Sequence, residues 1–363
     1  FIKCGLPDRI SLFILRMSRG ASKLLTLISF LLIFILSIFV PSNVGKGSLV
    51  ASVLDSLIRS LQKINETTNL GKTLFIGVAY LAGISGGFIA TGASSTIYAF
   101  GLFSVINPDM NYMKWFLIFG VPILFFVVML WLLFLVIYPP EYINKRLLMN
   151  VIDVRIEQLG QMKGEEKKVL LIIGATLILW TTQHLHGFSI PQIGLLGACL
   201  TIMPGIGIWK WEEAKKSVDW DIVLFFASTL MVAGMLLNTG TIEWLSVYLH
   251  QFLKNHSPLI TVLILVLITS LIRLMFVNIL GFLTIMLPLA ITLGDKLEGI
   301  TSLTLAMPVF LACIPGFFLI SQSPIHIISY SYGYFSEKDL LKAGLISQIL
   351  WLCMISGAFL FYW

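Results

Sequence analysis

The sequence predicts an all-α polytopic membrane protein, and its composition and its apolar runs are the observations that predict it. Of the 363 residues, 58% are hydrophobic and 12% are charged, whereas ordinary soluble domains carry roughly 25% charged residues. Apolar runs of roughly 18 or more residues recur along the chain, and each is long enough to cross a hydrocarbon core about 30 Å thick. The alternating segments of about ten residues that build a membrane β-barrel are not visible.

Some apolar segments do not fit a simple span. Segment 47–58 is too short to cross the bilayer at 1.5 Å per residue, so we interpret it together with 24–41 as a re-entrant hairpin. Segments 73–106 and 301–334 are too long for one span, and small and polar residues interrupt each near its middle. We expect two transmembrane helices broken at membrane depth, where irregular backbone is tolerated beside protein or a water-filled cavity.

Landmarks that occur twice predict an internal repeat. Gly5 opens a weakly amphipathic stretch that leads through an apolar run to Asn43, 38 residues later, and Gly240 opens a similar stretch that leads to Asn278, also 38 residues later. With two hairpins and seven full spans, 19 of the 24 Lys and Arg fall on one side of the membrane and three on the other. The positive-inside rule makes the first side cytoplasmic. Five spans separate the copies, so the repeats are inverted, as in many secondary transporters.

The predicted organisation therefore has three parts. The expected parts are 1–138 as the C-terminal portion of the first inverted repeat (re-entrant hairpin 24–58, broken helix 73–106, span 114–138), 139–167 as a cytoplasmic linker, and 168–363 as the second repeat (spans 168–187, 189–208 and 219–237, hairpin 257–293, broken helix 301–334, span 343–362).

The hairpin tips carry candidate cation and substrate ligands. Ser42, Asn43 and Asn278 would stand at membrane depth, where amide oxygens and freed backbone carbonyls suit sodium. The alternative is an interhelical hydrogen bond, which is common for polar residues in bundles. Because two asparagines occupy matching repeat positions, we favour the cation sites. Gly92 and Ser321, beside the helix breaks, complete the possible sodium ligands.

Two basic residues fall inside the hairpins, where a charge is costly and should face a cavity or a partner. Lys46 is a candidate counter-charge for an anionic substrate. Pairing with Asp55, or a side chain that reaches the headgroups, is the structural alternative. For Arg273 the structural role is favoured.

The helix breaks carry hydroxyl groups and helix N-termini that suit a carboxylate or an oxyanion. The candidate substrate ligands in the two breaks are Ser94, Ser95, Thr96, Ser323, Pro324 and His326. No Walker motif, nucleophile elbow or His/Cys metal cluster is visible, so the sequence predicts neither a cofactor nor an enzyme. Basic residues lie between the apolar runs rather than in one patch, which excludes a nucleic-acid partner.

These residues resemble the divalent anion/sodium symporter family, whose members carry dicarboxylates, citrate or sulfate. The first tip motif of that family is similar to Pro41-Ser42-Asn43-Val44-Gly45-Lys46, the second to Val277-Asn278-Ile279, and the two loops to Gly92-Ala93-Ser94-Ser95-Thr96 and Ser323-Pro324-Ile325-His326. The resemblance implies a homodimer in the cell membrane that works by elevator-type movement, with Na⁺ as the coupling ion. It also implies about four further spans before Phe1.

The sequence leaves several functions open. The leading hypothesis is a secondary active transporter of small anions, such as di- and tricarboxylates or sulfate, driven by sodium or by protons. A related permease for another oxyanion, such as an arsenite-type protein, is the second. A membrane-embedded enzyme or a subunit without transport activity is less favoured, because the acidic residues are confined almost wholly to loops and span ends.

Overall fold

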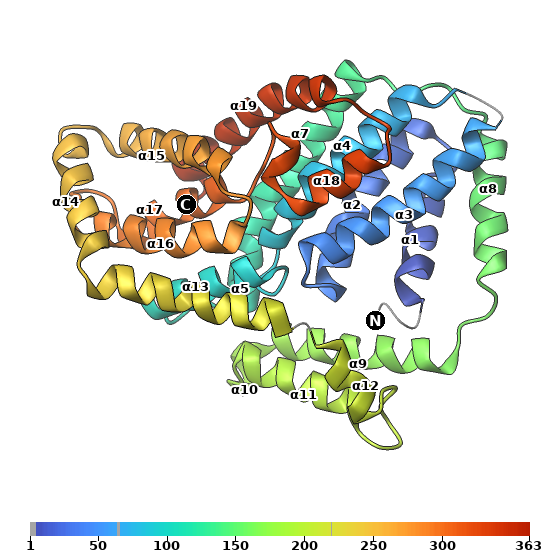
Figure 1. The fold of residues 1–363 in the computed structure, drawn as a ribbon, viewed down its shortest axis with the longest axis horizontal. Helices are drawn as coiled ribbons and strands as arrows, with labels where there is room; N and C mark the ends of the chain where they lie inside the picture. The colour runs from blue at the N-terminus through green and yellow to red at the C-terminus, as the bar shows by residue number, and fades with distance from the viewer. Residues whose placement is uncertain (1–4, 64–65, 219) are drawn as a thin grey trace.

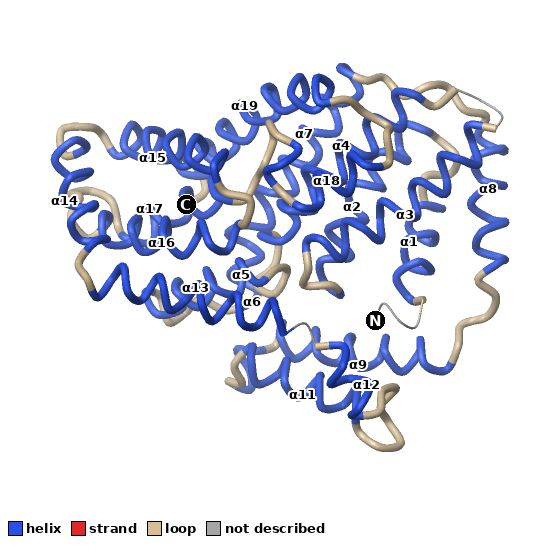
Figure 2. The backbone as a smooth tube through the Cα atoms, in the orientation of Figure 1, coloured by secondary structure: helices blue, strands red, loops and turns tan. Residues whose placement is uncertain are grey.

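The computed structural model describes residues 5–63, 66–218 and 220–363 (Figure 1). Helices and loops make up all of these described residues, and no strand occurs among them (Figure 2). Within the described part, five helices are long and apolar enough to cross a membrane, or six if a pair bent by 62° is one span. The five are Ser22–Phe39, Thr68–Gly87, Tyr112–Ile137, Pro258–Met275 and Glu337–Phe361. The predicted all-α membrane class is therefore confirmed.

The first part of the chain forms two long helices that meet at a sharp tip, and then a helix with a break. Its helices are α1 (Leu6–Arg16), α2 (Ser22–Phe39), α3 (Asn43–Gln62), α4 (Thr68–Ile84), η2 (Ser85–Gly87), α5 (Ser94–Ile106), α6 (Tyr112–Trp115), the π-helical turn η3 (Phe116–Gly120) and α7 (Val121–Ile137). The segment predicted as a linker contains α8 (Lys145–Gln158), which packs against α1 and α3.

The rest of the chain again contains two helices that meet at a tip, followed by a helix with a break. Its helices are α9 (Gly164–Thr181), α10 (Gln183–His186), α11 (Ile190–Ile202), α12 (Trp211–Ser217), α13 (Trp220–Asn238), α14 (Thr241–Leu253), α15 (Pro258–Ile272), η4 (Arg273–Met275), α16 (Ile279–Gly294), α17 (Ser302–Cys313), η5 (Ile320–Gln322), α18 (Pro324–Ser331) and α19 (Glu337–Phe361). Helix α19 begins six residues before the predicted span because Ser336 caps it, accepting a hydrogen bond from the backbone amide of Asp339 at 3.2 Å.

Local chemistry explains the tip between α2 and α3. Helix α2 ends at Phe39 because Val40 precedes Pro41, and a residue before proline disfavours helical backbone angles. Ser42 is then the N-cap of α3, and its hydroxyl accepts a hydrogen bond from the amide of Gly45 at 3.1 Å. Helix α3 runs for 20 residues, so the second arm is longer than the predicted segment 47–58.

The helix breaks begin earlier in the chain than the polar residues that marked them, residues 91–96 and 321–324. In the first, α4 passes into η2 and the chain is helical again from Ser94, so Ser94, Ser95 and Thr96 belong to α5 rather than to the break. Two adjacent glycines, Gly86 and Gly87, weaken the helix there, and a Cβ at Gly92 would lie 2.5 Å from the Gly86 carbonyl oxygen, so the chain returns on itself more closely than other residues permit. In the second, Pro315 follows the end of α17, and Pro324 occupies the first turn of α18.

The amphipathic helices before the two hairpins begin alike. Gly5 caps α1 with φ 74°, and Gly240 caps α14 with φ 73°, both in the left-handed region that glycine adopts most readily. The repeat landmarks that the sequence predicted therefore share a backbone conformation as well as a spacing.

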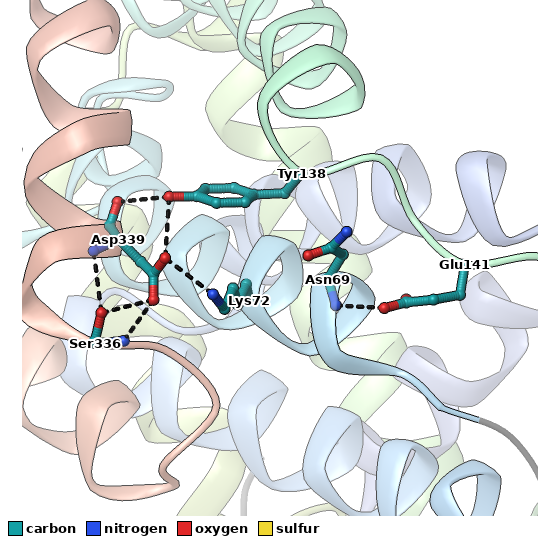
Figure 3. Close-up of polar contacts among 6 residues, drawn as sticks. All are labelled: Asn69, Lys72, Tyr138, Glu141, Ser336 and Asp339. Atoms are coloured by element: carbon teal, nitrogen blue, oxygen red, sulfur yellow. Dashed lines mark hydrogen bonds and ion pairs between the residues drawn. The ribbon is translucent and has the colours of Figure 1, made fainter.

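Helix α4 packs against α2, α3 and α18 (Figure 1) and is almost entirely buried. A polar cluster fastens its first turn to neighbouring elements (Figure 3): Lys72 is paired with Asp339 at 3.0 Å, and the Tyr138 hydroxyl donates to the Asp339 carbonyl oxygen at 3.0 Å. The Glu141 carboxylate accepts from the backbone amides of Asn69 at 2.6 Å and of the next residue at 3.0 Å. This cluster ties α4 to the start of α19 and to the end of α7, so elements far apart in sequence are held together.

Candidate functional site

A cavity of about 230 Å³ lies where the two hairpin tips and the two helix breaks meet. Its lining contains seven of the predicted site residues, from all four of these elements: Ser42, Asn43, Ser94, Ser95, Asn278, Ser323 and Pro324. The remaining lining residues are Pro41, Val44, Ala93, Phe225, Val277, Ile279 and Leu280. The described lining residues are neutral, and hydroxyl and amide groups supply their side-chain polarity.

Helix N-termini supply the positive potential of this cavity. The N-terminal residues of α3, α5, α16 and α18 all contribute to its lining. The N-terminus of a helix carries a partial positive charge and unpaired amide groups, and it binds anions. In the hairpins, the Ser42 and Asn278 side chains already cap the first turn. In the described structure neither Ala93 nor Ser323 caps its helix with a side chain. The amides of Thr96 and His326 already donate to the Ala93 and Ser323 carbonyl oxygens, and Pro324 has no N–H, so the amides that remain for a ligand are those of Ser94 and Ser95 in α5 and of Ile325 in α18.

Lys46 lies behind the first break and does not line the cavity. Its side chain is fully buried, and the ammonium group donates to the Ser37 hydroxyl at 2.7 Å and to the Gly92 carbonyl oxygen at 3.2 Å. Asp55 instead accepts hydrogen bonds from Arg59 at 2.9 Å and from the Tyr334 hydroxyl at 2.8 Å. The structural alternative of a Lys46–Asp55 pair is therefore wrong, because α3 directs the two side chains to different partners. Lys46 lies beside the first break but outside the cavity lining, so its role as a counter-charge for an anion stays a prediction.

Arg273, in the second half of the chain, also donates hydrogen bonds to carbonyl groups at a helix break. Its guanidinium donates to the carbonyl oxygens of Cys313 at 2.9 Å and of Gln322 at 3.4 Å, and also to that of Phe276. Cys313 ends α17 and Gln322 ends η5, so one buried side chain joins the second hairpin to both ends of the second break. In each half, a cation from the hairpin satisfies carbonyl groups that the helix break has left without partners.

Three further predicted residues lie outside the cavity lining. The Thr96 hydroxyl donates to the Gly86 carbonyl oxygen at 2.6 Å and so joins the start of α5 to η2 across the first break. His326 is buried with Nε2 at 2.6 Å from the Gly316 carbonyl oxygen, inside the second break. Ser321 is exposed in η5. The Thr96 hydroxyl and the His326 imidazole therefore contact backbone carbonyl groups of the broken helices. The sequence alone could not distinguish this role from ligand binding.

The oxygens proposed for sodium differ between the two tips. Asn43 Oδ1 is buried with no hydrogen-bond partner among the described residues, which leaves it available to a cation. Asn278 Oδ1 accepts from the Gly281 amide at 3.2 Å, and the Gly92 carbonyl oxygen accepts from Lys46. These oxygens therefore fit a sodium site only in part: Asn43 Oδ1 is free, whereas the Gly92 carbonyl oxygen is occupied by the Lys46 ammonium group. Among the described residues, no group of three or more His, Cys, Asp and Glu is placed to hold a metal ion.

Sequence reasoning missed Phe225 of α13, which lines the cavity although α13 lies outside the hairpins and the breaks. Phe225 stands in a stretch, residues 219–226, that also resembles the family, but the resemblance assigns it no role, because its place depends on how α13 packs against α16. It also left Ser37 unassigned, although a hydroxyl nine residues before Lys46 was a signal for a partner across the tip.

The described residues include five membrane-length helices, and the cavity lies at hairpin tips and helix breaks between them, an arrangement typical of a multi-pass integral membrane transporter. The whole chain, residues 1–363, matches the sodium:sulfate symporter transmembrane region, and the protein belongs to this family. The resemblance drawn from the tip and loop motifs is thereby confirmed.

The chain is also similar to individual curated proteins. It is 23% identical over 358 residues to a citrate/succinate antiporter of Escherichia coli K12, covering 97% of this chain and 73% of that protein. It is 22% identical over 368 residues to the L-tartrate/succinate antiporter of the same strain, again covering 97% and 73%. A membrane protein of Cupriavidus necator is 22% identical over 365 residues, covering 99% and 71%.

Proposed function

We propose that this protein transports small di- and tricarboxylate anions across the membrane. The observation that carries the proposal is the neutral cavity on which the N-termini of α3, α5, α16 and α18 converge. Such a cavity attracts anions without a titratable group in its lining. The names of two similar proteins, antiporters of citrate, tartrate and succinate, support carboxylates over sulfate or another oxyanion.

The movement we propose is an elevator-type displacement of the hairpins and broken helices of the two inverted repeats. The hairpins and broken helices would carry the cavity, while α9 and α11 would stay in place. Each hairpin follows an amphipathic helix that begins at a left-handed glycine, Gly5 or Gly240, and a glycine permits the change in backbone angles that such an arm needs. A homodimer is part of this proposal, and light scattering of the purified protein in detergent tests it.

For the coupling mode, we propose exchange of one anion for another without a requirement for sodium. The Gly92 carbonyl oxygen, one of the expected sodium ligands, already accepts a hydrogen bond from the Lys46 ammonium. A fixed cation at this place repels a second one and itself offsets part of the charge of a bound anion.

Sodium-coupled symport is the second candidate, and one observation favours it: the buried, unpartnered Asn43 Oδ1. Proton coupling is a further alternative, but none of the described cavity-lining residues has a side chain that would carry the proton.

Counterflow in proteoliposomes tests both levels of the proposal. Vesicles loaded with unlabelled succinate would receive labelled succinate, citrate, tartrate, sulfate or arsenite outside, with sodium or with choline as the only salt cation. We expect saturable carboxylate uptake that needs an internal anion and is equal in the two salts. Uptake only in sodium supports symport, and uptake only of sulfate or arsenite overturns the carboxylate assignment.

A further inference from the structure

Arg9, on the amphipathic helix α1, binds the connection between α8 and α9. Its side chain is buried, and its guanidinium donates to the carbonyl oxygens of Gly160 at 2.9 Å, Leu159 at 3.2 Å and Gln161 at 3.3 Å. Its Nε lies 3.3 Å from the carboxylate of Glu166, which is also buried and stands in the first turn of α9. One side chain therefore contacts the end of α8, the turn that follows it, and the start of α9.

This turn joins two parts of the molecule that have different neighbours. Helix α8 is fastened to the first hairpin and its arm: Arg16 of α1 pairs with Asp153 at 2.8 Å, and Arg155 donates to the Ser56 carbonyl oxygen at 2.8 Å. Helix α9 packs mainly on α11, and this pair lies in the lower part of Figure 1. It meets the first hairpin at the tip, where Phe39 and Pro41 line a pocket together with Trp180 of α9. Along the chain, a displacement of the hairpin relative to the α9–α11 pair is absorbed at the turn that Arg9 holds.

Two left-handed glycines meet at the same junction. Gly160 ends α8 with φ 62°, and Gly5 begins α1 with φ 74°. A Cβ at Gly5 would lie 3.9 Å from Glu166 Oε1, so both glycines are close to the Arg9–Glu166 ion pair. Glycine at these angles changes conformation at little steric cost, whereas the buried ion pair between them resists separation because either partner alone would be an uncompensated buried charge.

We propose that Arg9 is a positioning residue for transport: it holds the α8–α9 turn at one point, so that the Arg9–Glu166 junction is the pivot about which α8 and the first hairpin rotate relative to α9. Changes in the backbone angles of Gly5 and Gly160 permit this rotation, and the Arg9 guanidinium holds the point about which it occurs. This inference rests on the proposed transport function, and it predicts a role in the rate of movement rather than in anion affinity.

Kinetics separate this role from a merely structural one. In the proteoliposome assay, Arg9→Gln should lower the maximal rate per folded molecule several-fold and leave the KM for succinate unchanged. Arg9→Lys, which keeps the charge beside Glu166, should recover part of the rate. Arg16→Gln is the matched control, because it removes an exposed α1–α8 ion pair of the same type. If Arg9→Gln lowers only the amount of folded protein, the pivot is refuted.

A distance measurement tests the junction without relying on transport. Spin labels at the exposed positions Val154 of α8 and Leu171 of α9, with the native cysteines replaced, report the angle between the helices. Arg9→Gln should broaden the distance distribution, and an unchanged width overturns the proposal. If the parent protein moves no anion, the proposed function fails while this result still stands.

Glycine variants give a second comparison in the same assays. Gly160→Ala should shift or broaden the distances and slow exchange. Gly187→Ala has the same kind of strain, with φ 72° and open space around the added Cβ, but lies between α10 and α11. It should leave both readouts unchanged, and equal effects of the two substitutions contradict the pivot.

Discussion

Ser42 and Asn278 occupy equivalent positions in the two hairpins. Each is the N-cap of the helix that follows the tip, and each side-chain oxygen accepts from the backbone amide three residues on, Gly45 at 3.1 Å and Gly281 at 3.2 Å. By its spacing from the preceding glycine Asn43 matches Asn278, but as a helix cap the residue that matches Asn278 is Ser42, one position earlier. Asn43 lies inside α3 with its amide against Gly86, where an added Cβ would come within 2.7 Å of Oδ1.

This difference predicts opposite effects for the two asparagines. Asn278→Ala removes a helix cap and should lower the free energy of unfolding by about 1 kcal/mol. Asn43→Ala removes an oxygen that has no partner among the described residues, so it should leave stability nearly unchanged and alter transport. Thermal unfolding in detergent and uptake at varied sodium concentration measure the two effects. Equal destabilisation by both substitutions contradicts the assignment of caps.

Lys46→Gln should weaken anion binding while the protein still folds. Glutamine retains a donor for the Gly92 carbonyl oxygen but loses the charge. A unit charge about 10 Å from an anion contributes roughly 1.7 kcal/mol at an effective dielectric constant of about 20, somewhat more than tenfold in affinity, and we take this general value as the upper limit of the loss. The KM for succinate measures the loss. Lys63→Gln, at the exposed end of α3, is the control, and an unchanged KM with lower stability would make Lys46 a structural residue only.

Arg273→Met should be among the most destabilising substitutions in the chain. It leaves the carbonyl groups of Cys313, Phe276 and Gln322 without their donor, and each buried unsatisfied group costs about 1–3 kcal/mol. Thermal unfolding measures the loss, with exposed Arg146→Met as the control. A small shift, comparable to that of the control, would mean that other groups satisfy the second break.

Two alanine substitutions for helical glycines should differ in sign. A Cβ at Gly47 of α3 would lie 2.6 Å from Ile325 of α18, so Gly47→Ala should separate the hairpin from the second broken helix and reduce both stability and uptake. Gly101 of α5 has open space around its Cβ, and Gly101→Ala should stabilise its helix by up to about 1 kcal/mol. Unfolding temperatures compare the pair, and destabilisation by both would indicate a general intolerance of alanine.

Glu141→Ala should loosen α4 at its first turn. The carboxylate accepts from the backbone amide of Asn69 (Figure 3) and from that of Leu70, both at the start of α4, and hydrogen bonds to charged groups contribute about 1.5–3 kcal/mol. Hydrogen exchange at the amides of Asn69 and Leu70 should become faster, whereas Glu157→Ala, at an exposed site on α8, should not change it. Unaltered exchange in Glu141→Ala would show that α4 is held elsewhere.

The sequence was sufficient for the membrane class, the tips and the existence of both breaks, because these follow from apolar length and from local residues such as Pro41 and Pro324. The cavity was also predictable in part, since polar residues at broken membrane helices must face protein or water. The extent of the breaks was not, because the residues that close them, Arg273 and Thr96, act on carbonyl groups distant in sequence.

His326 illustrates the same limit. A histidine beside a helix break is equally suited to a ligand or to a backbone carbonyl, and only the folded position of Gly316 decides between them. Phe225 could not be found because its place in the cavity depends on the packing of α13 and not on any local pattern.

The helix ends around the cavity hold their partial charges at every physiological pH, because a peptide dipole has no proton to gain or lose. The described lining residues are equally indifferent to acidity. If the cavity binds carboxylates as proposed, an effect of acid on binding by these groups originates in the solute, whose own carboxyl groups decide how many negative charges it presents. Acidifying the medium would then change which ionic form of the solute binds and leave the helix ends and the lining unchanged.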